Sequence, residues 1–138
     1  MMLKTSVWGG ITMHESGEMY LETILILGLR KNLVRAVDVS EEMGISKASV
    51  SRALVKLKKD ACIIVDDNGH IAFTEKGRAI AEKIYERHQV LTEILMALGV
   101  DRKTAAADAC KMEHDISDTT FDAMKRHLKA RQGAEQTQ

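Results

Sequence analysis

The chain has 138 residues, of which 45% are hydrophobic, and this is enough to bury the core of one domain or of two small ones. It contains no proline, so long uninterrupted helices can form. Lysine plus arginine and aspartate plus glutamate number 20 each, so the net charge alone indicates no polyanionic partner. No apolar run approaches the roughly 18 residues of a membrane span. Two cysteines without a secretory signal favour a cytoplasmic protein with free thiols.

The N-terminal part of the chain predicts an arm followed by a helix. Residues 1–14 contain no sustained apolar run and are expected to be flexible. A first helix is predicted from Glu15 to Leu29, because Tyr20, Ile24 and Leu27 recur at helical spacing.

A helix-turn-helix pattern follows. A short helix is predicted over Ala36–Met43, and Gly44 can supply the left-handed residue of a tight turn. Ser46 stands where an N-cap belongs, before a third helix from Lys47 to about Ala61. The segment from Ser46 to residue 59 carries five basic residues and no acidic one, as expected of a recognition helix.

A β-hairpin is predicted directly behind this basic helix. Two short β-branched runs, Ile63–Val65 and Ile71–Phe73, flank a turn that contains Asn68 and Gly69. A hairpin in this place is typical of the wing of a winged helix. The alternative for the basic helix is an ordinary solvated surface, but the order of cap, turn, basic helix and hairpin favours DNA binding.

The remainder of the chain predicts three further helices. A long one runs from Glu75 to Leu98, the next is capped by Asp101, and the last is capped by Ser117 or Asp118. Residues 131–138 are polar and are expected to form a disordered tail. The predicted fold class is therefore mainly α, with a winged helix-turn-helix domain followed by an all-helical domain.

A candidate metal site lies in the fifth predicted helix. Cys110, Glu113 and His114 are spaced i, i+3 and i+4, so in a helix they project from one face and offer thiolate, carboxylate and imidazole ligands. The alternative is that Cys110 is a small buried hydrophobe and the other two are surface residues. His88 falls on the apolar stripe of the long helix, where a single histidine is usually a core residue.

Several separated motifs together resemble one protein family. They are Glu18-Met19-Tyr20-Leu21, the winged helix-turn-helix, Arg87-His88, and Cys110-x-x-Glu113-His114. The chain is similar over roughly residues 15–128 to the diphtheria toxin repressor family of metal-responsive transcriptional regulators. That family includes the iron-dependent repressors and the manganese transport regulators.

The resemblance implies a homodimer that binds double-stranded operator DNA. It implies a DNA-binding domain over residues 15–75, a helical metal-binding and dimerisation domain over residues 76–130, and a metal site between them. The metal ligands that it implies are Met19, Glu22, His88, Cys110, Glu113 and His114. Of these, Met19 and the Cys-Glu-His trio match the iron branch, whereas Glu22 and His88 match ligand positions of the manganese branch.

The chain also departs from both branches of the family. Thr92 and Ala106 stand where the iron branch places ligands of a further metal site, so that site is not expected here. The manganese branch has aspartate at the position of Met19 and glutamate at that of Cys110. The resemblance is to the two-domain form, so the SH3-like third domain of many iron-branch members is not expected.

The donor types favour Fe²⁺ as the cofactor. Thioether and thiolate ligands suit softer metals than Mn²⁺, which is the alternative. Zn²⁺, Ni²⁺ or Co²⁺ can be expected to substitute in vitro, because the Irving–Williams order favours them. The expected function is metal-dependent repression, in which the metal ties the first helix to the dimerisation domain and so selects a DNA-binding arrangement.

Candidate DNA-binding residues follow from the same resemblance and from their charge. They are Ser46, Lys47, Ala48, Ser49, Arg52, Lys56, Lys59 and His70. Arg52 is expected to read guanine through two hydrogen bonds, whereas Lys56, Lys59 and the wing near His70 are expected to contact phosphates.

Three other functions fit parts of the pattern. A winged-helix regulator could sense oxidation through Cys110 or bind a small organic ligand instead of a metal. A metalloenzyme could use Cys110, Glu113 and His114 to hold a catalytic zinc, but no separate general base or glycine-rich loop is recognisable, so no enzyme is expected. A structural DNA-binding dimer would carry the polar cluster by chance. No membrane partner and no organic cofactor are expected.

Overall fold

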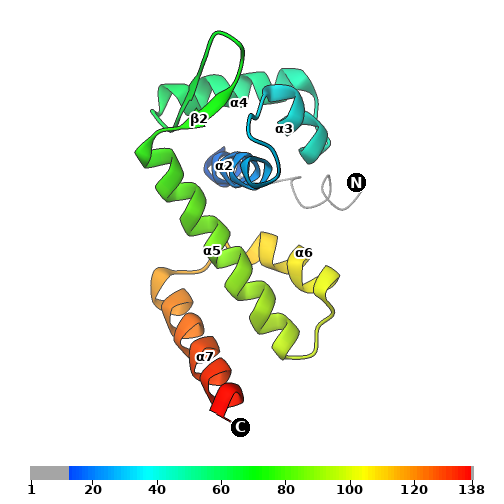
Figure 1. Ribbon diagram of the computed structural model, residues 1–138, viewed down its shortest axis with the longest axis vertical. Coiled ribbons are helices and arrows are strands. Elements are labelled where there is room, and N and C mark those ends of the chain that lie inside the picture. The colour runs from blue at the N-terminus through cyan, green and yellow to red at the C-terminus, as the bar shows by residue number, and fades with distance from the viewer. Residues whose placement is uncertain (1–12, 138) are drawn as a thin grey trace. The chain divides into compact units, whose positions relative to one another are not determined.

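The structure is a computed structural model that describes residues 13–137, so nearly all of the expected N-terminal arm lies outside the described residues. The chain divides into two compact units, and the division falls between Lys83 and Ile84 in the sequence, later than the predicted boundary at residues 75/76. The elements, of which all but β1 are labelled in Figure 1, are α2 (Met13–Arg30), α3 (Ala36–Met43), α4 (Lys47–Lys59), β1 (Ile63–Val65), β2 (Ile71–Phe73), α5 (Glu75–Ala97), α6 (Arg102–Met112) and α7 (Asp118–Thr137). The predicted fold class, a winged helix-turn-helix followed by helices alone, is confirmed.

The first unit is built around the helix-turn-helix of α3 and α4. α3 ends because Gly44 adopts a left-handed backbone with φ of 68° and donates its amide to the Ser40 carbonyl. Ser46 then begins α4 by accepting a hydrogen bond of 3.1 Å from the Ser49 amide. The apolar faces of the two helices are buried through Val39, Met43, Val50, Leu54 and Leu57. The turn and the cap therefore occur where the sequence predicted them.

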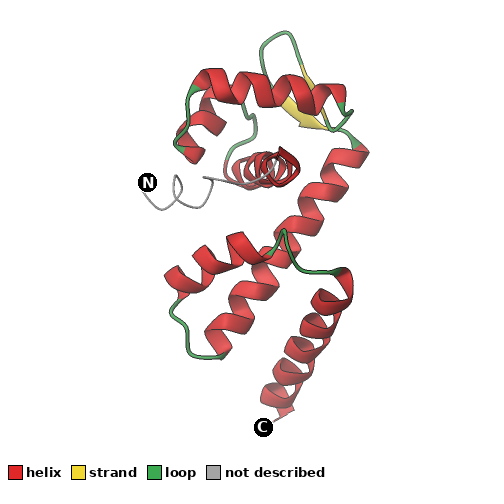
Figure 2. Ribbon diagram, turned by 180° about the vertical axis from the view of Figure 1, so that it is seen from behind, coloured by secondary structure: helices red, strands yellow, loops and turns green. Residues whose placement is uncertain are grey.

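The wing is a two-stranded antiparallel hairpin in contact with α4, and Figure 2 shows its strands beside that helix. Ile63 lies opposite Phe73 in the register. Gly69 supplies the left-handed turn residue with φ of 83°, and the Asp66 carboxylate accepts hydrogen bonds from two backbone amides of the turn. The predicted hairpin is therefore correct in both its strands and its turn.

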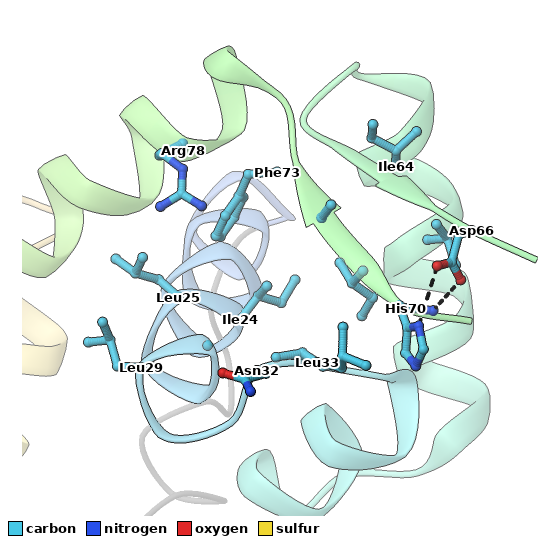
Figure 3. A pocket seen from close by; sticks show the side chains of 15 residues that line it. Ile24, Leu25, Leu29, Asn32, Leu33, Ile64, Asp66, His70, Phe73 and Arg78 are labelled. Atoms are coloured by element: carbon cyan, nitrogen blue, oxygen red, sulfur yellow. Dashed lines mark hydrogen bonds and ion pairs between the residues drawn. The ribbon is translucent and has the colours of Figure 1, made fainter. Parts of the chain in front are cut away.

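A groove with a volume of about 570 Å³ separates the hairpin from the C-terminal part of α2. Figure 3 shows its mainly aliphatic walls and the guanidinium of Arg78, whose carbon lies 5.2 Å from the centre of the Phe73 ring. Leu29, Leu33 and Ile64 line the groove and are exposed. The hairpin therefore does not pack closely against α2 over this stretch.

The base of the wing is joined firmly to the start of α5. The Thr74 hydroxyl accepts a hydrogen bond of 3.1 Å from the Gly77 amide and donates one of 2.7 Å to the Ala61 carbonyl. Gly77 packs against the backbone carbonyl of Cys62 so closely that a Cβ atom at this position would overlap it. The first turns of α5 consequently belong to the first unit.

The second unit consists of the C-terminal half of α5 with α6 and α7, which lie alongside it in Figures 1 and 2. Asp101 caps α6 by accepting a hydrogen bond of 3.0 Å from the Thr104 amide. The small apolar core of this unit includes Leu91, Ala109 and Phe121. In the described part of the chain, no helix is long and apolar enough to cross a membrane.

Several helix ends differ from the prediction, and α2 begins at Met13, two residues before the predicted start at Glu15. α4 ends at Lys59, because Ala61, which was expected to continue the helix, has a left-handed φ of 61°. α7 continues to Thr137, although a disordered tail was expected from residue 131. That segment contains no proline, and its arginine, alanine, glutamate and three glutamines are good helix formers.

Candidate metal centre and DNA-binding helix

The donor residues of the second unit come from two helices and a turn. His88 lies on α5, and Cys110 lies in the last turn of α6. α6 ends at Met112, so Glu113 is its C-cap, with helical φ and ψ of −61° and −23°, and His114 follows in the turn. The predicted helical spacing therefore holds between Cys110 and Glu113 and ends there.

Three of these donors converge on one point. Nδ1 of His88 lies 3.0 Å from Oε2 of Glu113 and 3.7 Å from Sγ of Cys110. One donor atom from each residue can be chosen so that all three lie within 4.8 Å of one another. Donors that bind one first-row ion at about 2.0–2.3 Å stand roughly 3.0–3.7 Å apart. The two distances from His88 fall in this range, and the three side chains together are close enough to share a metal ion.

The fourth donor, His114, contacts the same carboxylate. Its Nε2 lies 3.4 Å from Oε1 of Glu113, and its side chain is 2% exposed. Glu113 itself is 0% exposed, and a buried carboxylate is costly unless cations or hydrogen bonds compensate its charge. The alternative that Glu113 and His114 are plain surface residues is therefore wrong.

The chemistry of this donor set suits a transition metal. Nitrogen, sulfur and oxygen donors are combined, and neither cysteine of the chain forms a disulfide, so the sulfur of Cys110 is available as a ligand. A divalent cation held by these residues would offset the negative charge of the buried carboxylate. The residues present therefore fit a bound metal, and their role as ligands remains a prediction.

The other two predicted ligands lie on α2 in the first unit. Met19 is 1% exposed and Glu22 is 3% exposed, and residues three apart on a helix lie on the same side. A thioether and a carboxylate are thus presented together from one buried stripe. The structure places these two donors in the first unit and His88, Cys110, Glu113 and His114 in the second.

Sequence reasoning assigned no role to Arg87, which the structure places next to this cluster. Its side chain is 7% exposed and donates to the backbone carbonyls of Glu113 and Ile116. The signal available in the sequence was its position between Ile84 and Leu91 on the apolar stripe of α5, where an arginine must have partners.

The recognition helix α4 presents its predicted DNA-binding residues to solvent. Ser46, Lys47, Ala48, Arg52, Lys56 and Lys59 are exposed, and Ser49 is half-buried. Arg52 donates a hydrogen bond of 3.3 Å to the Ser49 hydroxyl, which in turn interacts with the Ser46 hydroxyl at 3.0 Å. Burial raises the pKa of Tyr20 on α2, and the positive charge of Arg52 opposes this rise. The hydrogen bond to Ser49, which itself contacts Ser46, therefore holds the Arg52 side chain along the helix.

The wing is less suited to phosphates than the recognition helix. His70 is half-buried, and its Nδ1 lies 3.3 Å from Oδ2 of Asp66, as Figure 3 shows. Asp66 and Asp67 are both exposed near the tip of the hairpin and carry negative charge. His70 is thus engaged within the wing, and its contact with DNA remains a prediction.

Comparison with protein families agrees with this arrangement. Residues 12–71 match the family model described as the iron dependent repressor N-terminal DNA binding domain. Residues 74–134 match the model described as the iron dependent repressor metal binding and dimerisation domain. The chain belongs to the iron-dependent repressor family. This is the diphtheria toxin repressor family that the sequence motifs resembled, and it consists of metal-dependent transcriptional regulators.

Individual members of the iron-dependent repressor family show how similar the chain is to known proteins. It is 31% identical over 107 residues to the HTH-type transcriptional regulator MntR of Geobacillus kaustophilus. The aligned segment covers 78% of this chain and 76% of that protein. MntR of Bacillus subtilis is also 31% identical over 107 residues. These relatives are transcriptional regulators and not enzymes.

Two solved structures of regulators share the fold. The manganese regulator SloR is 25% identical with a TM-score of 0.73, and the metal-dependent transcriptional regulator MtsR is 26% identical with a TM-score of 0.76. In both comparisons 82% of this chain is covered, and it spans 53% of the solved chain. The chain therefore covers about half the length of these two structures.

Proposed function

We propose that this protein is a cytoplasmic, homodimeric transcriptional repressor whose binding to operator DNA requires a divalent metal. The observation that carries the proposal is the convergence of His88, Cys110 and Glu113, whose donor atoms lie within 4.8 Å of one another. The same chain carries a recognition helix with an exposed basic face. Membership of a family of metal-dependent regulators supports the link between these two sites.

We favour Fe²⁺ as the activating metal because of the sulfur donors. Cys110 contributes a thiolate and Met19 a thioether, and both suit Fe²⁺ better than Mn²⁺. Mn²⁺ is the second candidate, because the chain is similar to the manganese regulator SloR. Zn²⁺, Ni²⁺ and Co²⁺ are expected to bind in vitro as well, so the metal supply of the cell contributes to selectivity.

In this proposal, Met19 and Glu22 complete the donor set of His88, Cys110, Glu113 and His114. A metal held by residues of both units stabilises the arrangement of the dimer that fits DNA, in which the two recognition helices stand about 34 Å apart, one turn of the double helix. The metal can shift the population from the inactive to the active arrangement of the dimer only as far as it binds the active arrangement more tightly. A shift from 1% to 99% of the active form requires about 10⁴-fold tighter metal binding to that form.

The reading of DNA is assigned to the exposed face of α4. Arg52 lies near the start of the recognition helix, and a bidentate contact with guanine is worth about 1–3 kcal/mol of discrimination. Lys56 and Lys59 are exposed farther along the helix and are assigned to phosphates. Such phosphate contacts make the affinity for DNA fall as the salt concentration rises.

The test is anaerobic binding to a pool of genomic DNA fragments with Fe²⁺, Mn²⁺, Zn²⁺ or a chelator. We expect binding with Fe²⁺ at low free metal, its loss on chelation, and its loss in Cys110→Ala. Cys62→Ala is the matched control, because it removes the other free thiol without removing a donor. Stronger activation by Mn²⁺ than by Fe²⁺ would assign Mn²⁺ instead. DNA binding that is unaffected by the chelator but is lost on oxidation would overturn the proposal in favour of a thiol sensor.

A further inference from the structure

We infer that Arg87 is a positioning residue that holds the Glu113–His114 segment in place for metal binding, an inference that rests on the metal-dependent function proposed above. Arg87 immediately precedes His88 on α5. His88 is thus a candidate ligand, and Arg87 holds the backbone that carries two further candidate ligands, Glu113 and His114.

The chain needs such a support because α6 ends in the middle of the donor cluster. The last carbonyls of a helix have no partner within the helix and must find one elsewhere. Nη1 of Arg87 donates to the carbonyl of Glu113 at 3.1 Å and to that of Ile116 at 2.8 Å. One nitrogen atom therefore fixes both ends of the turn that contains His114.

The guanidinium has two further contacts, one through Nη2 and one through its face. Nη2 of Arg87 forms an ion pair with the Asp118 carboxylate in the first turn of α7. The Arg87 guanidinium carbon also lies 5.4 Å from the centre of the buried Phe121 ring. A planar fork with this many partners defines a direction as well as a charge, which a lysine ammonium cannot do. Arg87 thus connects α5, the turn after α6 and the start of α7.

The position of Glu113 is sensitive to this connection. Its carboxylate lies between Nδ1 of His88 and Nε2 of His114, at 3.0 Å and 3.4 Å. If the Glu113 carbonyl loses its donor, the C-cap of α6 can relax, and the carboxylate moves with its backbone. Residues that orient metal ligands from outside typically contribute about 10–100-fold to metal affinity. Arg87 acts in this way through backbone carbonyls.

The experiment is a Co²⁺ titration of the full chain under anaerobic conditions, followed by the thiolate-to-cobalt charge-transfer and d–d absorption bands. Arg87→Met is expected to weaken Co²⁺ affinity about 10–100-fold and to alter the d–d bands. Arg87→Lys keeps the charge and can donate to only part of the turn, so it is expected to recover part of the affinity. The fraction of folded protein is measured by circular dichroism in each sample.

Asp101→Ala is the matched control for a purely structural effect, because it removes the N-terminal cap of α6, at the end of that helix away from the donors, and leaves the contacts of Arg87 in place. It is expected to lower thermal stability and to leave the Co²⁺ spectrum and affinity of the folded protein unchanged. If Arg87→Met and Arg87→Lys bind Co²⁺ like the wild type, or Asp101→Ala weakens binding equally, the inference is overturned. If the wild type itself binds no Co²⁺, the proposed function fails first, so the two failures are distinguishable.

Discussion

Replacing Glu113 by glutamine tests the metal centre with the smallest change in shape. Glutamine keeps one acceptor oxygen and replaces the second carboxylate oxygen by an NH2 donor, so it can still lie against both Nδ1 of His88 and Nε2 of His114, which are 3.0 Å and 3.4 Å from the carboxylate oxygens. The metal-free protein should therefore keep its stability to within about 1 kcal/mol, the size of one net hydrogen bond. What is lost is the negative charge that a divalent cation needs.

The expected loss appears in the metal-dependent part of the stability. At a free metal concentration 100 times Kd, binding stabilises the folded wild type by about 2.7 kcal/mol. Glu113→Gln removes a ligand itself, so we expect affinity to fall by about 100-fold, the upper end for a residue that only supports a ligand. At the same metal concentration, the variant would then gain only about 0.4 kcal/mol, a difference of about 2.3 kcal/mol.

The assay is urea unfolding of wild type and variant, with Co²⁺ and with a chelator, followed by circular dichroism. Glu86→Gln is the matched control, because Glu86 is a carboxylate of the same unit that pairs with Lys125 at 2.7 Å and touches none of the donors. Glu86→Gln should retain the full metal-dependent gain. An equal gain in Glu113→Gln would refute the assignment of Glu113 as a ligand, and a loss of several kcal/mol without metal would show that its carboxylate is structural.

Three further predictions concern the DNA-binding unit. Gly77→Ala should destabilise the fold by about 1–3 kcal/mol in urea unfolding, because a Cβ at residue 77 would overlap the backbone of Cys62. Gly28→Ala is the control and should be neutral or stabilising, because a Cβ there meets nothing within 4 Å. Equal effects of the two substitutions would contradict this reasoning. Arg52→Ala should relax sequence preference in a selection from random operators, whereas uniform weakening of all sequences would make Arg52 a phosphate contact. Hydrogen bonds from the backbone amides of His70 and Asn68 lower the pKa of Asp66. The wing turn should therefore keep its full stability above about pH 4 and lose the contribution of Asp66 as the pH falls through the depressed pKa of that residue. The measurement is an NMR titration of the His70 amide from pH 6 to 2 in the wild type and in Asp66→Asn. The same titration curve in both proteins would refute the prediction.

The sequence by itself determined the helices, the turn chemistry and the types of donor. Ser46 and Asp101 cap helices at the predicted places, Gly44 takes the left-handed conformation that was expected, and Gly69 lies in the predicted hairpin turn. These features follow from interactions within a few residues, which capping, periodicity and turn preferences describe. The choice of metal follows from the donor types and remains a proposal.

Only the tertiary structure decided which side chains meet. His88 and Glu113 are 25 residues apart in sequence, and the packing of α5 against α6 brings their polar atoms to 3.0 Å. The complete burial of Glu113 and the hydrogen bonds from Arg87 to the turn after α6 depend on the same packing. Helical spacing fixes only the direction of a side chain from its own axis, whereas distances between helices depend on how all their contacting side chains fit together.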